Sequence, residues 1–201
     1  MAESLLRSWW ARFRGRLEPI PCPYSDAAVL DMPLRRLVAS PERILVDFGI
    51  AVGDRVLEVG SGVGYYSVEA ARRVGASGRL LCLDLQKEML LEARRRVQRA
   101  NQTGADFIAA SATQLPVASG SVDHIFLVTV LGEIPDRRRA LAEFRRVLRP
   151  PGFLSISEQL PDPDFVTRKT LRQELGAAGF IEERTRGHFF YTSTWRLAAS
   201  S

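Results

Sequence analysis

The stretch Glu58-Val59-Gly60-Ser61-Gly62-Val63-Gly64 is the part of the sequence best suited to binding a ligand. It follows a short apolar run and precedes an amphipathic segment, which predicts a turn between a buried strand and a helix. Glycines at such a turn let the backbone approach a ligand closely. A carboxylate at Glu58 suits a cationic amino group and disfavours a pyrophosphate. The stretch therefore predicts a small-molecule site at a strand-to-helix junction.

A dinucleotide-binding enzyme is the nearest alternative for this glycine pattern. Its phosphate-binding fingerprint, G-x-G-x-x-G, requires a glycine at position 65, which is Tyr65 here. The third glycine of this chain comes one residue too early. Together with the charge of Glu58, this spacing disfavours a nicotinamide oxidoreductase.

The same residues closely resemble motif I of class I S-adenosylmethionine-dependent methyltransferases, E-x-G-x-G-x-G. The resemblance continues at Asp84, which follows the apolar run Leu80–Leu83. An acidic residue at this place in the family holds both ribose hydroxyls, and a carboxylate can accept two hydrogen bonds. Taken alone, Asp84 is equally explained as the cap of a helix that begins near Gln86.

A third segment, 110–117, resembles the D-A-x-x-L-P-F segment of the family, with Ser111 in place of the usual aspartate. Adenine recognition is then expected to depend on the Ser111 hydroxyl, the Ala112 backbone and apolar packing. The segment 147–154 resembles the turn before the fifth strand, where Phe153 replaces a glycine. The resemblance implies S-adenosylmethionine as cofactor, bound by Glu58, Gly60, Ser61, Gly62, Gly64, Asp84, Leu85, Ser111, Ala112 and Thr129.

Methyl transfer from a sulfonium mainly requires that the reactants are positioned, and a general base only where the nucleophile must lose a proton. Glu133 follows the predicted fourth strand and is the main candidate for an acid, base or substrate-orienting group. Capping the next helix would explain it equally well. His188 is a second candidate base, although its place beside Gly187 is also typical of a surface residue. The substrate-pocket candidates are aromatic: Tyr24, Tyr65 and Tyr66.

The segment 128–136 lacks the N/D-P-P-Y loop of nucleic-acid amino methyltransferases and glutamine methyltransferases. We therefore expect a small-molecule or lipid-like substrate. The alternatives are a nucleic-acid or protein methyltransferase, or a non-catalytic cofactor-binding protein.

No metal is expected. An arsenite methyltransferase would need several pocket thiols, but the chain has two cysteines and Cys82 lies in an apolar run. The net charge of +5 comes mostly from arginines spread along the chain, so no specific nucleic-acid partner is expected.

These candidate residues must be positioned by an alternating pattern of strands and helices. We expect strands at 55–59, 79–83, 106–109, 124–128 and 153–157, and helices at 65–74, 87–100, 136–148 and 167–178. Pro150-Pro151-Gly152 is expected to stop the third of these helices. Ser40 should cap a helix that starts at Pro41 and stops at Gly49. The runs 180–186 and 188–197 predict a terminal antiparallel hairpin.

The predicted fold is α/β, a doubly wound, mostly parallel seven-stranded sheet of Rossmann-like type, within a domain at 40–201. Residues 1–39 form a helical leader in this prediction. Its residues 5–17 carry an apolar stripe beside arginines, which predicts either a lid on the substrate pocket or a peripheral contact with anionic lipid. No secretion signal or membrane-spanning stretch is recognised, and a cytoplasmic location is expected.

Overall fold

A computed structural model of the chain describes residues 39–198. Its first element, α4 (Pro41–Phe48), begins and ends where the sequence predicts. The Ser40 side chain accepts a hydrogen bond from the backbone N–H of Arg43 at 3.4 Å, and Pro41 occupies the first turn. Gly49 ends the helix in the left-handed conformation, with φ of 78°, which costs glycine little.

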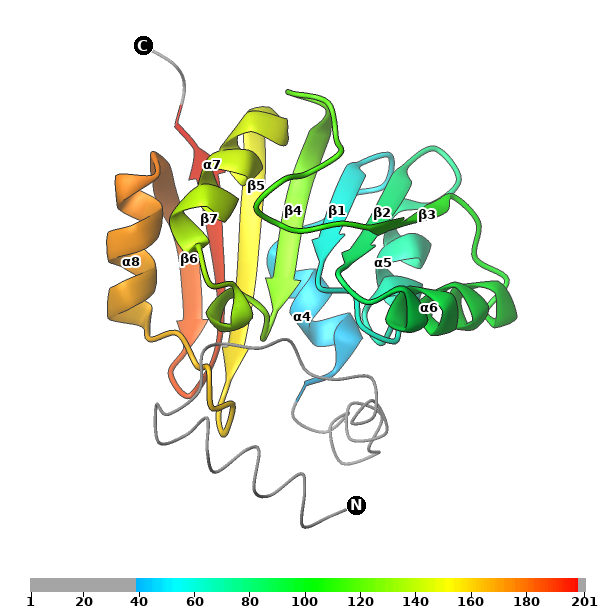
Figure 1. Cartoon of the computed structure of the whole chain (residues 1–201), viewed down its shortest axis with the longest axis horizontal. Coiled ribbons are helices and arrows are strands. Elements are labelled where there is room, and N and C mark those ends of the chain that lie inside the picture. The colour runs from blue at the N-terminus through cyan, green and yellow to red at the C-terminus, as the bar shows by residue number, and fades with distance from the viewer. Residues whose placement is uncertain (1–38, 199–201) are drawn as a thin grey trace.

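The core of the fold is a seven-stranded sheet with the order β3-β2-β1-β4-β5-β7-β6 (Figure 1). Strands β1 to β5 pair in parallel, and β7 pairs antiparallel with both β5 and β6. The predicted doubly wound sheet with a terminal hairpin is therefore confirmed. The strands are β1 (Arg55–Val59), β2 (Arg79–Asp84), β3 (Ala105–Ala109), β4 (Val122–Val128), β5 (Leu148–Gln159), β6 (Phe180–Gly187) and β7 (Phe190–Leu197).

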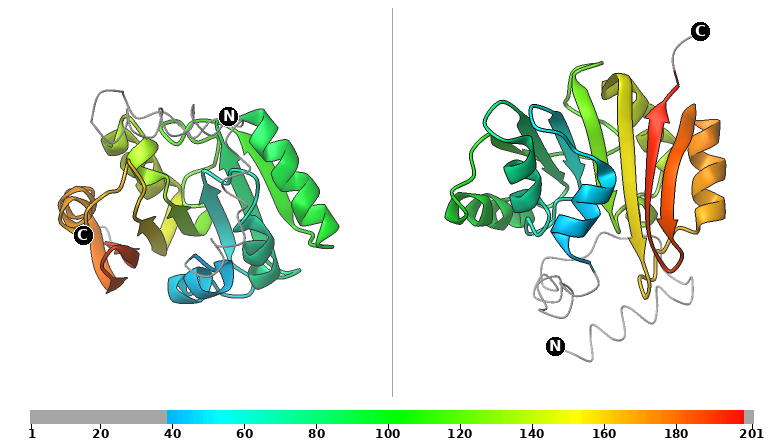
Figure 2. Two further views of the ribbon diagram at one scale, coloured as in Figure 1. Left: turned by 90° about the horizontal axis from the view of Figure 1, so that it is seen from below. Right: turned by 180° about the vertical axis from the view of Figure 1, so that it is seen from behind.

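Helices cover both faces of this sheet, and each face has its own apolar core. Side chains of α4, α5 (Ser67–Val74) and α6 (Lys87–Arg99) pack on one face. Side chains of α7 (Arg137–Val147) and α8 (Arg168–Ala177) pack on the other. The rear view in Figure 2 shows α4 lying across the sheet from α8. Burial on both faces explains why the central strands are almost continuously apolar.

The junction between α7 and β5 corrects one prediction. The sequence predicts a helix over 136–148 that Pro150-Pro151-Gly152 stops, but the helix ends at Val147 and β5 already begins at Leu148. The β4–β5 pairing runs from Val122↔Leu148 to His124↔Phe153, with an irregularity in between. The prolines lie in this irregular part, where no regular ladder needs the N–H group that proline lacks.

Several predictions concern residues outside the described range. The leader over 1–39, the lid or lipid contact of residues 5–17, and the substrate candidate Tyr24 stay predictions for this reason. Within residues 39–198, none of the helices combines the length and apolar character needed to span a bilayer.

Candidate active site

The glycine-rich loop after β1 docks on the carboxyl end of β2. The backbone N–H groups of Gly60 and Ser61 both donate to the carbonyl oxygen of Leu83, at 2.8 and 3.0 Å. Gly60, Gly62 and Gly64 have φ angles of 71°, 52° and 82°, in the left-handed region. Because a side chain is strained there, this turn depends on its glycines.

Two glycines of the loop also permit close packing. A Cβ atom at Gly60 would lie 2.5 Å from a methyl group of Val130, which follows β4. A Cβ atom at Gly64 would lie 2.7 Å from the Cα atom of Ala93 in α6. The loop is therefore held between β2, α6 and the segment after β4, at the carboxyl edge of the sheet.

Asp84, the last residue of β2, links the loop to the start of α6. Its Oδ2 atom accepts from the backbone N–H of Gly62 and its Oδ1 atom from that of Gln86, each at 2.9 Å. Burial raises the pKa of this carboxyl, while the backbone donors of Gln86, Gly62 and Leu85 act in the opposite direction. The bond to Gln86 anchors the residue just before α6, not an N–H group of its first turn, so it is not a helix cap in the usual sense. Each carboxylate oxygen keeps capacity for a further hydrogen bond, so the predicted ribose contact stays compatible with it.

Glu58 has different surroundings from those expected. Its side chain is 2% exposed and accepts a hydrogen bond from the Ser67 hydroxyl at 2.5 Å, at the first turn of α5. Burial raises the pKa of Glu58 to about 8. In this structure the carboxyl therefore tends to be neutral near pH 7 and stabilises the start of α5. Its predicted contact with an amino group of the ligand stays a prediction.

The buried carboxyl of Glu58 leads to a testable pH dependence. An unfolded chain releases the Glu58 proton near pH 4.5 and the folded chain near pH 8, so ionisation disfavours the folded state increasingly between these values. Glu58→Gln removes this penalty and keeps an oxygen that can accept from Ser67. We expect the variant to gain stability relative to wild type as the pH rises, on the order of 3 kcal/mol by pH 8.5. Urea unfolding at pH 5 and pH 8.5 measures the difference, and a constant difference would contradict the burial argument.

The predicted adenine-binding residues follow β3 at the same edge. The Ser111 hydroxyl lies 2.8 Å from the Thr113 hydroxyl and accepts from the Thr113 N–H at 3.2 Å, which forms a local turn. Ala112 is buried in the core on the α7 side. Leu85, by contrast, is 56% exposed although it directly follows Asp84. The apolar side chain of Leu85 is therefore exposed to solvent next to the Asp84 carboxylate.

The segment after β4 carries the two remaining predicted residues of this edge. Thr129 has φ of 54°, an unusual conformation for a β-branched residue, and its N–H donates to the carbonyl of Ser157 at 2.8 Å. Glu133 ends the short 3-10 helix η2 (Leu131–Glu133) and is half-buried. The helix α7 is instead capped by Asp136, whose side chain accepts from the Arg139 N–H. Capping of α7 therefore does not account for Glu133.

The other candidates differ in position. Tyr65 and Tyr66 stack edge to face with ring centroids 5.0 Å apart, but Tyr66 is buried and its hydroxyl donates to the carbonyl of Ala39. This packing supports a structural role for Tyr66. His188 lies in the exposed turn between β6 and β7, where Nδ1 is 3.3 Å from a guanidinium nitrogen of Arg168. His124 is buried and contacts Ser155, as a structural histidine would.

Sequence reasoning missed Glu158. This residue lies near the carboxyl end of β5, is 1% exposed, and its Oε1 atom has no hydrogen-bond partner. A signal was present, because an acidic residue close to the carboxyl end of a buried strand is the same pattern that drew attention to Glu58.

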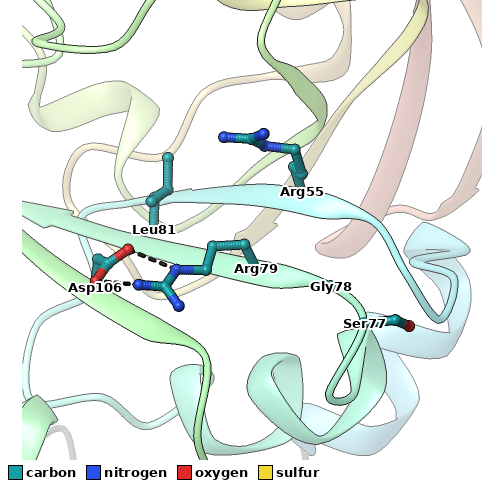
Figure 3. A pocket seen from close by; sticks show the side chains of 6 residues that line it. All are labelled: Arg55, Ser77, Gly78, Arg79, Leu81 and Asp106. Atoms are coloured by element: carbon teal, nitrogen blue, oxygen red, sulfur yellow. Dashed lines mark hydrogen bonds and ion pairs between the residues drawn. The ribbon is translucent and has the colours of Figure 1, made fainter.

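A surface depression lies at the opposite edge of the sheet. It is lined by Arg55, Ser77, Gly78, Arg79, Leu81 and Asp106. Figure 3 shows the Arg79 side chain directed at Asp106, and the two form an ion pair at 2.7 Å. Arg55 and Arg79 begin β1 and β2, so this hollow is at the amino ends of the strands. The predicted ligand residues instead gather at the carboxyl ends, beside the point where strand order reverses between β1 and β4, which is where open α/β sheets bind ligands.

Comparison with known proteins identifies a domain that covers most of the parallel part of this sheet. Residues 57–156 match the family model of a methyltransferase domain. Residues 57–156 are a methyltransferase domain with the class I methyltransferase fold. A domain of this kind implies S-adenosylmethionine as the cofactor.

Two curated relatives and one solved structure are similar to this chain. An arsenite methyltransferase of Halobacterium salinarum is 34% identical over 120 residues, which cover 58% of this chain and 31% of the relative. A ubiquinone/menaquinone biosynthesis C-methyltransferase of Marinomonas is 32% identical over 111 residues, which cover 55% of this chain and 44% of the relative. The chain thus spans less than half the length of these relatives. A methyltransferase structure from Aquifex aeolicus matches with a TM-score of 0.82 at 24% identity, covering 88% of this chain and all of the other.

Proposed function

We propose that this chain transfers a methyl group from S-adenosylmethionine to a small-molecule or lipid-like acceptor in the cytoplasm. The observation that carries the proposal is the clamp between the glycine-rich loop and Asp84, in which Gly62 donates to a carboxylate at the edge where the strand order reverses. When bound, the cofactor supplies an electrophilic methyl group on sulfonium, which is already an excellent leaving group.

The residues around the clamp fit such a cofactor in polarity. Ser61 is 5% exposed and its hydroxyl oxygen has no hydrogen-bond partner in the protein, a partner that a ligand held by the loop would supply. Asp84 retains acceptor capacity for hydroxyl groups. The exposed Leu85 offers an apolar surface for a ring. A hydroxyl acceptor, a carboxylate and an apolar platform together match the mixed polarity of a nucleoside.

Positioning is the main contribution that this chain makes to the reaction. The loop is fixed by its bonds to Leu83 and by its close packing on α6, so little is lost to ordering it when the reactants bind. Glu133 is the proposed group that orients the acceptor or takes its proton, because it follows β4 at this edge and is only half-buried. His188 is a second proposed base, although it lies in the exposed turn of the β6–β7 hairpin.

The residues after β4 favour a small-molecule acceptor over a nucleic acid or a protein. The segment Thr129–Asp136 has no N/D-P-P-Y loop, and the two curated relatives are named for arsenite and quinone chemistry. We do not extend arsenite to this chain, because Cys82 lies fully buried in β2 and is the sole cysteine within residues 39–198. Its thiol cannot reach a ligand.

Incubation of the full chain with methyl-labelled S-adenosylmethionine tests the proposal. Separate reactions receive a metabolite extract, a lipid extract, protein and nucleic acid, and Asp84→Ala serves as the control for cofactor-dependent labelling. We expect label in an extract-derived small molecule or lipid. Label confined to protein or nucleic acid would support the polymer alternative, and cofactor binding without any labelled product would support a non-catalytic role.

A further inference from the structure

Glu158 is a buried carboxyl group that the mechanism above does not use. It lies near the carboxyl end of β5, beside Tyr191 of β7 in the strand pairing, and is 1% exposed. Its Oε2 atom accepts a long hydrogen bond of 3.4 Å from the backbone N–H of Val166, and its Oε1 atom has no partner. Because an unsatisfied buried polar atom is costly, its presence calls for an explanation.

Further acidic groups surround Glu158 at this edge. Glu133, after β4, and Asp162, after β5, both lie close enough for their charges to act on it. Arg137 at the start of α7 is the cation that opposes them, but its guanidinium makes three hydrogen bonds of 2.7 to 3.1 Å to Glu174. The local balance around Glu158 is therefore negative.

The backbone brings these acidic loops together directly. A Cβ atom at Gly132, in η2, would lie 1.8 Å from the carbonyl oxygen of Asp164, so only glycine fits between the loop after β4 and the loop after β5. Glu158 lies on β5, the strand directly next to β4, and the loop after β4 carries Glu133, the residue proposed to orient the acceptor.

Aromatic rings complete the surroundings of the carboxyl. Tyr191 packs edge to face on Phe165 with ring centroids 5.8 Å apart, and its hydroxyl donates to the carbonyl of Val166 at 2.6 Å. Carboxylates together with aromatic faces are the groups that recognise organic cations. A metal ion is a poorer fit, because no set of three acidic, histidine or cysteine side chains within residues 39–198 is arranged to hold one.

We propose that Glu158, with Glu133 and Asp162, binds an organic cation such as an alkylammonium group of the acceptor substrate. This inference rests on the proposed methyltransferase function and assigns the substrate class for the same site. Burial, Asp162 and Glu133 all raise the pKa of Glu158. These effects favour the neutral form of the carboxyl, and a bound cation would compensate the cost of its ionisation.

Binding of matched probes to the full chain tests the proposal. S-adenosylhomocysteine is titrated first by calorimetry, and the loaded protein then receives 2-phenylethylammonium, neutral 2-phenylethanol or phenylacetate. We expect the ammonium to bind at least tenfold more tightly than the alcohol, and the carboxylate not to bind. Equal affinity for the ammonium and the alcohol would overturn the inference while leaving the methyltransferase proposal intact. Failure to bind S-adenosylhomocysteine would overturn both.

Three variants test whether Glu158 and Glu133 cause the preference for the ammonium over the alcohol. Glu158→Gln keeps the shape of the side chain and should reduce the preference for the ammonium to less than threefold, with unchanged affinity for S-adenosylhomocysteine. Glu133→Gln should weaken it partially and provides a second test if Glu158→Gln does not fold. Glu183→Gln is the control, because this glutamate is exposed on β6 and pairs with Arg196. Retention of the preference in both Glu158→Gln and Glu133→Gln, or its loss in the control, would contradict the assignment.

Discussion

Asp84→Ala is expected to weaken binding of S-adenosylhomocysteine by about 1.5–3 kcal/mol, the usual range for hydrogen bonds to a charged group. This corresponds to a loss of roughly tenfold to a hundredfold in affinity. The structure adds a second reason for the effect. The same carboxylate holds the N–H groups of Gly62 and Gln86, so its removal also releases the loop and the start of α6.

Asp84→Asn separates these two contributions. Asparagine keeps one carbonyl oxygen that can accept from Gly62 or Gln86, so it should lower stability less than alanine does, while affinity still falls because the charged acceptor is lost. Asp106→Asn is the matched control, since this carboxylate on neighbouring β3 pairs with Arg79 at the far edge. Calorimetry and thermal unfolding on the three variants measure both effects. Unchanged affinity in both Asp84 variants would disprove the ribose assignment.

Gly64→Ala should lower the free energy of unfolding by about 2–4 kcal/mol. A side chain at φ of 82° costs about 1–2 kcal/mol, and overpacking against a rigid neighbour adds about 1–3 kcal/mol. The neighbour is the backbone of Ala93, which is fully buried in α6 and cannot move away by a simple rotation. We also expect weaker cofactor binding, because α6 or the loop must shift to accept the methyl group.

Gly120→Ala provides the control for the backbone conformation alone. Gly120 has φ of 60°, and a Cβ atom there would meet nothing within 4 Å. Its replacement should therefore cost only the conformational part, about 1–2 kcal/mol, and leave cofactor binding unchanged. Urea unfolding compares the two variants. An equal loss in both would show that close packing on α6 does not explain the need for glycine at position 64.

Local signals in the sequence were sufficient for most elements and for the cofactor loop. The helix α4 was predicted with both ends correct, because Ser40, Pro41 and Gly49 act on backbone groups within a few residues of themselves. Strand β1 was also predicted with correct ends, since an apolar run followed by glycines is a local pattern. The family resemblance depended on the same short segments, which the sequence displays directly.

The start of β5 shows where local signals fail. Pro150 and Pro151 were expected to separate a helix over 136–148 from a strand over 153–157, yet α7 ends at Val147 and β5 begins at Leu148, which pairs with Val122 of β4. Pairing with a strand more than twenty residues away in the chain cannot be read from the local sequence pattern. Tertiary pairing therefore set the start of β5, five residues before its predicted start.

The chemical states of the acidic side chains were decided by tertiary structure alone. Glu58 and Glu158 each lie one residue before the end of a strand, but Glu58 has Ser67 as a donor whereas one oxygen of Glu158 has no partner. Asp84 binds two backbone groups from segments on either side of it. Burial, available donors and neighbouring charges determine whether a carboxyl ionises, and these depend on segments that are distant in the chain and meet only when the sheet forms.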